Sequence, residues 1–327
     1  MRRRDFLAAS LASLVPAALA APALAKYPER SVRLVIPRGA GGVLDVVGRH
    51  WCNGIAKSLG VPVYIENIAG AGGVIGMANA AKANPDGYSL LLGSTSDIVL
   101  MPLQQRKLSF DAENDFQPIS LTAVSVGSIA VNAGLPVNTL SEFIDYAKVN
   151  ASKLNYASVG AGTMSHLIME EFRRQAALPE ILHVPYRTGA SAFNDLVAGI
   201  VQLQAVFITT PTIELHRAGK IKILAATSSK RLSGAPEIPT TAEAGLPNFI
   251  GEMSFGIFAP KNTPTEIVET LHAKTQEVLA DPEFQQILGK SGLDPVLGST
   301  PASAAEQFRK ERALWRPIVE SIPVKEG

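Results

Sequence analysis

Apolar and polar positions along the chain predict strands that are followed by helices. An apolar run at residues 32–36 ends at a proline and opens into a glycine-rich stretch, residues 38–42. Beyond this stretch, apolar residues recur at helical spacing: Leu44, Val47, Trp51, Ile55 and Leu59. The pattern predicts a buried strand, a glycine-rich turn and an amphipathic helix.

Two further strands are predicted to end in loops of the same kind. A strand near residue 65 leads into the glycines of 69–73, and a strand at 88–92 leads into Gly-Ser-Thr-Ser at 93–96. The carboxyl ends of parallel strands meet at one edge of a sheet, where ligands bind in α/β folds. Backbone N–H groups at helix starts attract anions, so we expect these loops and 37–45 to form one anion-binding mouth. The hydroxyls of 93–96 also suit helix caps, and both roles remain open.

The second half of the chain repeats this arrangement of a strand, a glycine-rich turn and a helix. A long β-rich run at 119–131 is predicted to cross into a second lobe, which has a strand at 154–158 and a glycine turn at 159–166. A strand is also predicted at 201–208, and a β run at 253–260 returns the chain to the first lobe. Two α/β lobes joined by two crossings imply a hinge and a cleft that closes on a ligand.

Helix starts are predicted from three local signals. Thr139 with Glu142 forms a capping box for a helix at 140–150, and Thr263 with Glu266 forms another. Thr300, followed by proline, begins the last helix.

Composition suits a globular protein, and the N-terminus predicts export from the cytoplasm. The chain has 327 residues, 46% of them hydrophobic, and a net charge of +1, which suits a globular protein with a large core and gives no electrostatic case for nucleic acid. Residues 1–25 read as an export signal peptide with arginines, an apolar stretch and the cleavage shape Ala23-Leu24-Ala25. Arg3-Arg4 favours twin-arginine export, with the ordinary secretory route as the alternative. We expect a periplasmic protein that starts near Lys26.

The sequence carries few signs of catalytic chemistry. The five histidines lack metal-ligand spacing, and the single cysteine, Cys52, is interpreted as a buried apolar residue. No nucleophile elbow surrounds Ser158, and no phosphate-binding or dinucleotide motif is complete. His166 is the best catalytic candidate, but a histidine that orients its loop is favoured. Asp45 is expected to fix its loop rather than transfer protons. We predict no enzyme activity, no metal and no cofactor.

The ordered motifs resemble one known family over essentially the whole mature chain. The motifs are Tyr27-Pro28, the strand 32–37, Gly41-Gly42, Asp45, Glu66-Asn67, Gly70-Ala71-Gly72-Gly73, 85–88, 91–93, 154–158, Gly162-Thr163, His166-Leu167, 183–186, 218–220, 242–245 and 258–260. On these residues the chain resembles substrate-binding proteins of the tripartite tricarboxylate transporter, also called the Bug or TctC-like family.

The resemblance implies a two-lobed α/β periplasmic binding protein of type II, a Venus flytrap with a ligand cleft between the lobes and a two-strand hinge. We expect lobe 1 at 26–125 and 252–327 and lobe 2 at 126–251. The implied function is to capture a small organic carboxylate, as a monomer, for membrane transporter subunits. A ligand sensor that signals through its closed state is the alternative. The implied ligand-binding residues are Gly41, Gly42, Asp45, Gly72, Gly73, Ser94, Ser96, Gly162, Thr163, Ser165 and His166.

The sequence departs from the family pattern at two places that bear on the ligand. Arg38 stands where members usually have an aromatic residue, and its guanidinium either reaches the cleft to bind a carboxylate or points to solvent. Residues 206–208 are apolar where many members carry an aspartate that receives a ligand amine. This second departure argues against an amino-acid ligand.

Overall fold

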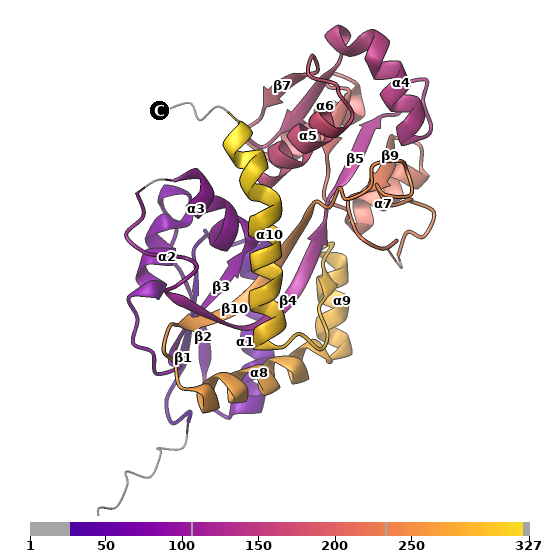
Figure 1. Ribbon diagram of the computed structural model, residues 1–327. Coiled ribbons are helices and arrows are strands. Elements are labelled where there is room, and N and C mark those ends of the chain that lie inside the picture. Colours follow the sequence, from indigo (N-terminus) through magenta and orange to yellow (C-terminus); the bar gives the residue numbers. More distant parts are fainter. Residues whose placement is uncertain (1–26, 106, 233, 323–327) are drawn as a thin grey trace, which may run out of the picture.

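The computed structural model describes residues 27–105, 107–232 and 234–322, which form two α/β lobes (Figure 1). The expected export signal at 1–25 lies outside the described residues. One lobe is built on a six-stranded sheet of order β11-β4-β10-β3-β1-β2, and the other on a five-stranded sheet of order β7-β6-β8-β5-β9.

The six-stranded sheet combines parallel and antiparallel pairs. Its strands are β1 (Val32–Ile36), β2 (Val63–Asn67), β3 (Ser89–Ser94), β4 (Phe116–Val126), β10 (Glu252–Pro260) and β11 (Asp294–Pro295). Strand β1 runs parallel to β2 and β3, as the strand-helix pattern predicts, whereas β10 lies antiparallel between β3 and β4. Strand β10 has the opposite direction because it returns the chain from the other lobe.

Helices accompany this sheet in the first lobe. They are α1 (Val43–Leu59), α2 (Val74–Ala81), α3 (Met101–Gln104), α8 (Thr265–Leu279), α9 (Pro282–Lys290) and α10 (Pro301–Ser321). On α1 the predicted apolar stripe is buried up to Ile55, and Cys52 is buried as expected. A Cβ on Gly48 would lie 2.7 Å from Ile36 Cδ1, so glycine is needed where α1 meets the sheet.

The five-stranded sheet forms the second lobe. Its strands are β5 (Ser128–Asn132), β6 (Asn155–Ser158), β7 (Leu182–Pro185), β8 (Leu203–Ala205) and β9 (Ile221–Ala226), and its helices are α4 (Leu140–Asn150), α5 (Met164–Gln175), α6 (Gly189–Ala198) and α7 (Thr210–Arg217). The predicted strand at 201–208 is wrong in extent. After β8 the chain leaves the ladder, and the Ile208 N–H donates to the Val126 carbonyl at 2.8 Å.

The lobes are joined where β4 passes into β5 and where the chain returns to β10. Only Gly127 separates β4 from β5, so the predicted single run at 119–131 is two strands in two sheets. Gly127 N–H donates to Gly251 O at 3.1 Å, Gly251 N–H to Thr227 O at 2.8 Å, and Thr227 N–H to Gly127 O at 2.9 Å. A Cβ on Gly127 would lie 2.7 Å from Ile168 Cδ1, which leaves no room for a side chain at this crossing.

The three predicted helices begin at Leu140, Thr265 and Pro301, but only two of them have the predicted threonine cap. The Thr139 hydroxyl accepts from the Glu142 N–H at 3.1 Å, and Thr300 caps α10 together with Ser303. The box at Thr263 is wrong, because its hydroxyl donates to the Pro260 carbonyl at 2.7 Å and α8 has no side-chain cap.

Candidate functional site

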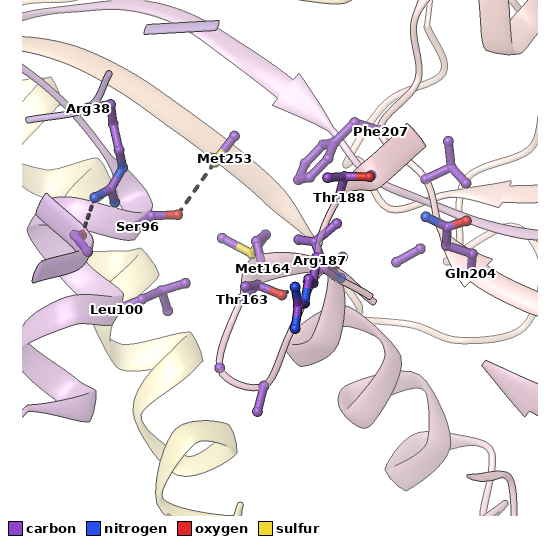
Figure 2. Close-up of a pocket in the computed structure, with 18 of the residues that line it drawn as sticks. Arg38, Ser96, Leu100, Thr163, Met164, Arg187, Thr188, Gln204, Phe207 and Met253 are labelled. Carbon is purple, nitrogen blue, oxygen red and sulfur yellow. Dashed lines mark hydrogen bonds between the residues drawn. The ribbon is translucent and has the colours of Figure 1, made fainter. Parts of the chain in front are cut away.

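A cleft of about 1240 Å³ is lined by residues of both lobes (Figure 2). The first lobe contributes Arg38, Gly72, Ser96, Leu100, Met101, Gln104, Gln105 and Met253. The second lobe contributes Val159, Ala161–Ser165, Arg187–Ala190, Phe193, Gln204–Phe207 and Thr212. The glycine loops of both lobes therefore border one cavity, as the order of strands and loops predicts.

The first-lobe loops are held together by close packing of their backbones. A Cβ on Gly76, in the first turn of α2, would lie 2.7 Å from Pro37 Cα. The absence of a side chain lets the second glycine loop pack directly on the first. Both loops lead into helices, α1 and α2, so their N-terminal backbone groups lie at the same end of the sheet.

Arg38 is turned toward its own lobe. Its Nη2 lies 2.6 Å from Oδ1 of Asp97, whose side chain is fully buried, and its Nη1 donates to the carbonyl of Gly72. Ser94 donates to the other oxygen of Asp97 through its N–H at 3.0 Å and its hydroxyl at 2.7 Å. Burial raises the pKa of Asp97, and Arg38 and Ser94 offset this only in part.

The Arg38 side chain remains 34% exposed and lines the cleft. The two readings of the sequence, a cleft arginine or a solvent arginine, are both incomplete. The guanidinium borders the cleft, but its charge is compensated by Asp97, which the sequence analysis did not single out.

Asp45 fixes the first loop, as expected from the sequence. Its carboxylate accepts from the Gly41 N–H at 3.0 Å and from Arg49 at 2.8 and 3.1 Å. Burial opposes ionisation of Asp45, but the hydrogen bonds from Arg49 and Gly41 outweigh it and hold its pKa below the ordinary value. Neither Asp45 nor Gly41 and Gly42 lines the cleft.

The other first-lobe candidates fall into two groups, residues that line the cleft and residues that support its loops. Gly72 and Ser96 line the cleft, and the Ser96 hydroxyl lies 3.7 Å from the sulfur of Met253. Gly73 lies under the Arg38 guanidinium, and Ser94 is buried against Asp97. Gly73 and Ser94 therefore maintain the conformation of the loops and do not line the cleft.

The second-lobe turn is ordered by side chains of α5. The Gly162 N–H donates to His166 Nδ1 at 3.1 Å, and the Val159 N–H donates to Ser165 Oγ at 3.2 Å. An Nδ1 that accepts must be unprotonated, so His166 carries its proton on Nε2. Gly162, Thr163 and Ser165 line the cleft, whereas His166 lies behind them and orients the loop.

A first-lobe side chain reaches this turn across the cleft. The Gln104 amide donates to the Gly162 carbonyl at 2.6 Å. This contact joins α3 of one lobe to the cleft-lining turn of the other.

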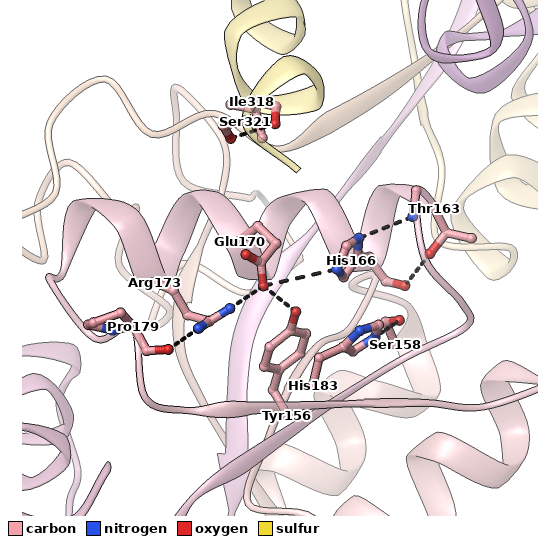
Figure 3. Close-up of polar contacts among 12 residues, drawn as sticks. Tyr156, Ser158, Thr163, His166, Glu170, Arg173, Pro179, His183, Ile318 and Ser321 are labelled. Carbon is pink, nitrogen blue, oxygen red and sulfur yellow. Dashed lines mark hydrogen bonds and ion pairs between the residues drawn. The ribbon is translucent and has the colours of Figure 1, made fainter. Parts of the chain in front are cut away.

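His166 belongs to an aromatic stack that the sequence did not reveal (Figure 3). Its ring lies 4.3 Å from that of His183, which lies 4.8 Å from that of Tyr156. Glu170 accepts from Tyr156 and lies 2.5 Å from Arg173 Nη1. Burial is the main cause that lowers the pKa of His166 and lowers that of His183 to about 4, so both rings are neutral near pH 7.

His183 also lies 2.7 Å from the Ser158 hydroxyl, a pairing that resembles an activated nucleophile. Ser158 is fully buried, however, and neither residue lines the cleft. The Ser158 hydroxyl accepts from the Gly160 N–H at 3.1 Å, so the Ser158–His183 pair stabilises the glycine turn at 159–166.

Arg187 and Gln204 are cleft residues that the sequence analysis did not select. Arg187 follows β7 and precedes α6, and it forms no ion pair or hydrogen bond with another described residue. Gln204 lies on β8, is 5% exposed, and its Oε1 has no hydrogen-bond partner. The position of Arg187 just past a strand end was a usable signal, whereas nothing local marks Gln204.

The described part of the chain holds no group of three or more metal-ligating side chains. None of the helices in it is long and apolar enough to span a membrane.

The fold and the cleft together define a two-lobed α/β binding protein. Residues 47–323 match the model of the tripartite tricarboxylate transporter family receptor, and the chain belongs to this family. It is similar to the periplasmic binding protein BugD, at 33% identity and a TM-score of 0.72 over 90% of this chain and 98% of that one.

Two further solved structures carry carboxylates. MatC from Rhodopseudomonas palustris, with bound malate, is 30% identical with a TM-score of 0.73 over 90% of this chain and 100% of that one. A second R. palustris protein, with adipate, is 30% identical with a TM-score of 0.75 over 90% and 97% of the two chains. The resemblance inferred from the sequence motifs is confirmed.

Proposed function

We propose that this protein is exported, captures a small organic carboxylate in the cleft between its lobes and delivers it to membrane transporter subunits. The observation that carries the proposal is the chemistry of the cleft lining. It contains two arginines, several hydroxyls and the N-terminal turns of α5 and α6, but none of the lining residues is Asp or Glu. Such a lining favours an anion and offers no partner to a cation.

The ligand-binding residues of this proposal are a revision of those expected from the sequence. Direct contact is assigned to Ser96, Gly72, Gly162, Thr163 and Ser165, with Arg38 at the rim. The remaining candidates, Gly41, Gly42, Asp45, Gly73, Ser94 and His166, act indirectly by holding the loops. The malate and adipate of the two similar proteins support a carboxylate as the class of ligand.

Lobe closure completes the proposed site. Lobe 1, residues 26–125 and 252–327, closes on lobe 2, residues 126–251, by rotation about the two crossings at Gly127 and Gly251. The Gln104–Gly162 hydrogen bond is a contact of the closed form. The protein acts as a monomer, because closure must stay free.

The test is a thermal-shift and calorimetric screen of the purified protein, first unfolded and refolded to remove any copurified ligand. The panel holds mono-, di- and tricarboxylates, amino acids and sugars. A ligand at about 100 times its dissociation constant stabilises the folded state by about 2.7 kcal/mol and raises the melting temperature. Shifts from carboxylates alone support the proposal. A shift from sugars with none from any carboxylate refutes it.

The delivery step needs a second test in cells. Deletion of the gene is expected to abolish uptake of the labelled ligand, and a cleft variant that does not bind is expected not to restore uptake. Normal uptake with loss of a ligand-dependent transcriptional response would instead identify the protein as a sensor.

A further inference from the structure

The charges that line the cleft are unevenly compensated. Arg38 is neutralised by the buried carboxylate of Asp97, which lies 2.6 Å away. Arg187 has no acidic partner among the described residues, and no Asp or Glu is among the residues that line the cleft. The cleft therefore presents one uncompensated positive charge, and this charge belongs to the second lobe.

Much of the remaining lining is apolar. Leu100, Met101 and Met253 line the cleft from the first lobe, and Met164, Phe193 and Phe207 from the second. Figure 2 shows Met164 and Arg187 in the middle of the cleft, with Leu100 and Phe207 to either side. An apolar lining favours the binding of a ligand that buries hydrocarbon there. It disfavours a charged ligand group that has no partner in the cleft.

Gln204 adds one unsatisfied polar group to this apolar surface. Its side chain is more than nine-tenths buried, lines the cleft, and has an oxygen without a partner. Its neighbours on β8, Leu203 and Ala205, are buried apolar residues, so the amide is an isolated polar group on the strand. A buried polar atom without a partner destabilises the folded protein, and a hydrogen bond to a ligand group or a water removes this penalty.

From these three features we infer that the ligand is a monocarboxylate with an apolar body and a hydroxyl, and that Arg187 and Gln204 select it. Arg187 holds the carboxylate, the methionines and phenylalanines bury the hydrocarbon, and Gln204 binds the hydroxyl. A hydroxyl fits whichever atom of the amide faces it, since it both donates and accepts. This inference rests on the proposed function and narrows its substrate class.

The first test compares hexanoate with adipate by titration calorimetry. The two acids have the same chain length and differ in the second carboxylate. Hexanoate is expected to bind at least about tenfold more tightly, because the second charge of adipate would lose water without gaining a cation. Tighter binding of adipate overturns the inference and leaves the proposed function standing. Failure of every carboxylate to bind counts against the proposed function itself.

The second test replaces the cation. Arg187→Gln is expected to weaken hexanoate binding by about 10- to 100-fold, the range for loss of a charge-assisted hydrogen bond. The matched control is Arg316→Gln, which removes the same charge from an exposed position of α10 outside the cleft and is expected to leave affinity unchanged. Equal affinities of the two variants would refute the role of Arg187.

The third test concerns the hydroxyl. The unmodified protein is expected to prefer 3-(4-hydroxyphenyl)propionate over 3-phenylpropionate by about fivefold or more, on the scale of one hydrogen bond. Gln204→Leu has a similar size and removes the unsatisfied amide, so it is expected to abolish this preference while it raises the melting temperature. A preference for the hydroxylated acid that persists in Gln204→Leu overturns the assignment. A glutamine with a merely structural role would leave this preference unchanged when it is replaced.

Discussion

The ion pair between Arg38 and Asp97 gives the sharpest test of how the first-lobe loops are held. Asp97 is fully buried and its Oδ1 lies 2.6 Å from Arg38 Nη2. Two unit charges about 4 Å apart attract by about 4 kcal/mol at an effective dielectric constant near 20. The guanidinium is 34% exposed, so water screens part of this attraction. We expect Arg38→Ala to lower the free energy of unfolding by about 2–3 kcal/mol at pH 7.

The loss should depend on pH in a defined direction. Burial already raises the pKa of Asp97, and removal of Arg38 raises it further. Between the unfolded pKa and the higher folded pKa, the folded state binds more protons, so its stability falls as pH rises. The penalty of Arg38→Ala is therefore expected to shrink as the pH falls from 7 toward 4, because Asp97 becomes protonated in the variant.

The assay is urea unfolding followed by circular dichroism between pH 4 and 7.5, with two companion variants. Asp97→Asn in the Arg38→Ala background removes the buried charge and should recover part of the lost stability. Arg30→Ala breaks an exposed pair with Asp86 at 3.1 Å and should alter stability by less than about 1 kcal/mol. A loss in Arg38→Ala that is no larger than that in Arg30→Ala, or one that does not change with pH, would refute the reasoning.

Three further predictions address the turn, the hinge and the contact across the cleft. The pKa of His183 is lowered to about 4, so the unfolded state binds more protons than the folded state between about pH 6.5 and 4. The free energy of unfolding should therefore fall as the pH drops through this window. His183→Phe should reduce that fall, as measured by urea titrations at several pH values. Gly127→Ala adds a Cβ that would lie 2.7 Å from the nearest side chain and should lower the free energy of unfolding by about 1–3 kcal/mol, whereas Gly39→Ala, with nothing within 4 Å, should have little effect. Gln104→Ala removes the 2.6 Å bond to Gly162 and should weaken ligand affinity by about 2- to 10-fold with little change in melting temperature; calorimetry that gives unchanged affinity would contradict its role in closure.

Local patterns along the chain were sufficient for most of the framework. The apolar stripe of α1, the glycine turns before α1, α2 and α5, and the cap at Thr139 are short-range features, and each depends on residues that lie close together in the sequence. The ordered motifs also identified the family, which the match over residues 47–323 shows. The incorrect predictions also came from local patterns, which tertiary contacts overrode. Thr263 had the right neighbours for a cap, but its hydroxyl bonds to the end of β10 instead.

What the sequence by itself determined was the order of strands and helices, the loops that border the cleft and the family. Only the tertiary structure decided which side chains reach the cavity and with what charge. Arg38 meets Asp97 across 59 positions of sequence, and the stack of His166 with His183 joins a helix to a strand. Gln204 faces the cavity because of its place in the sheet. Charge compensation and burial depend on atoms that are distant in sequence, and no local pattern records those distances.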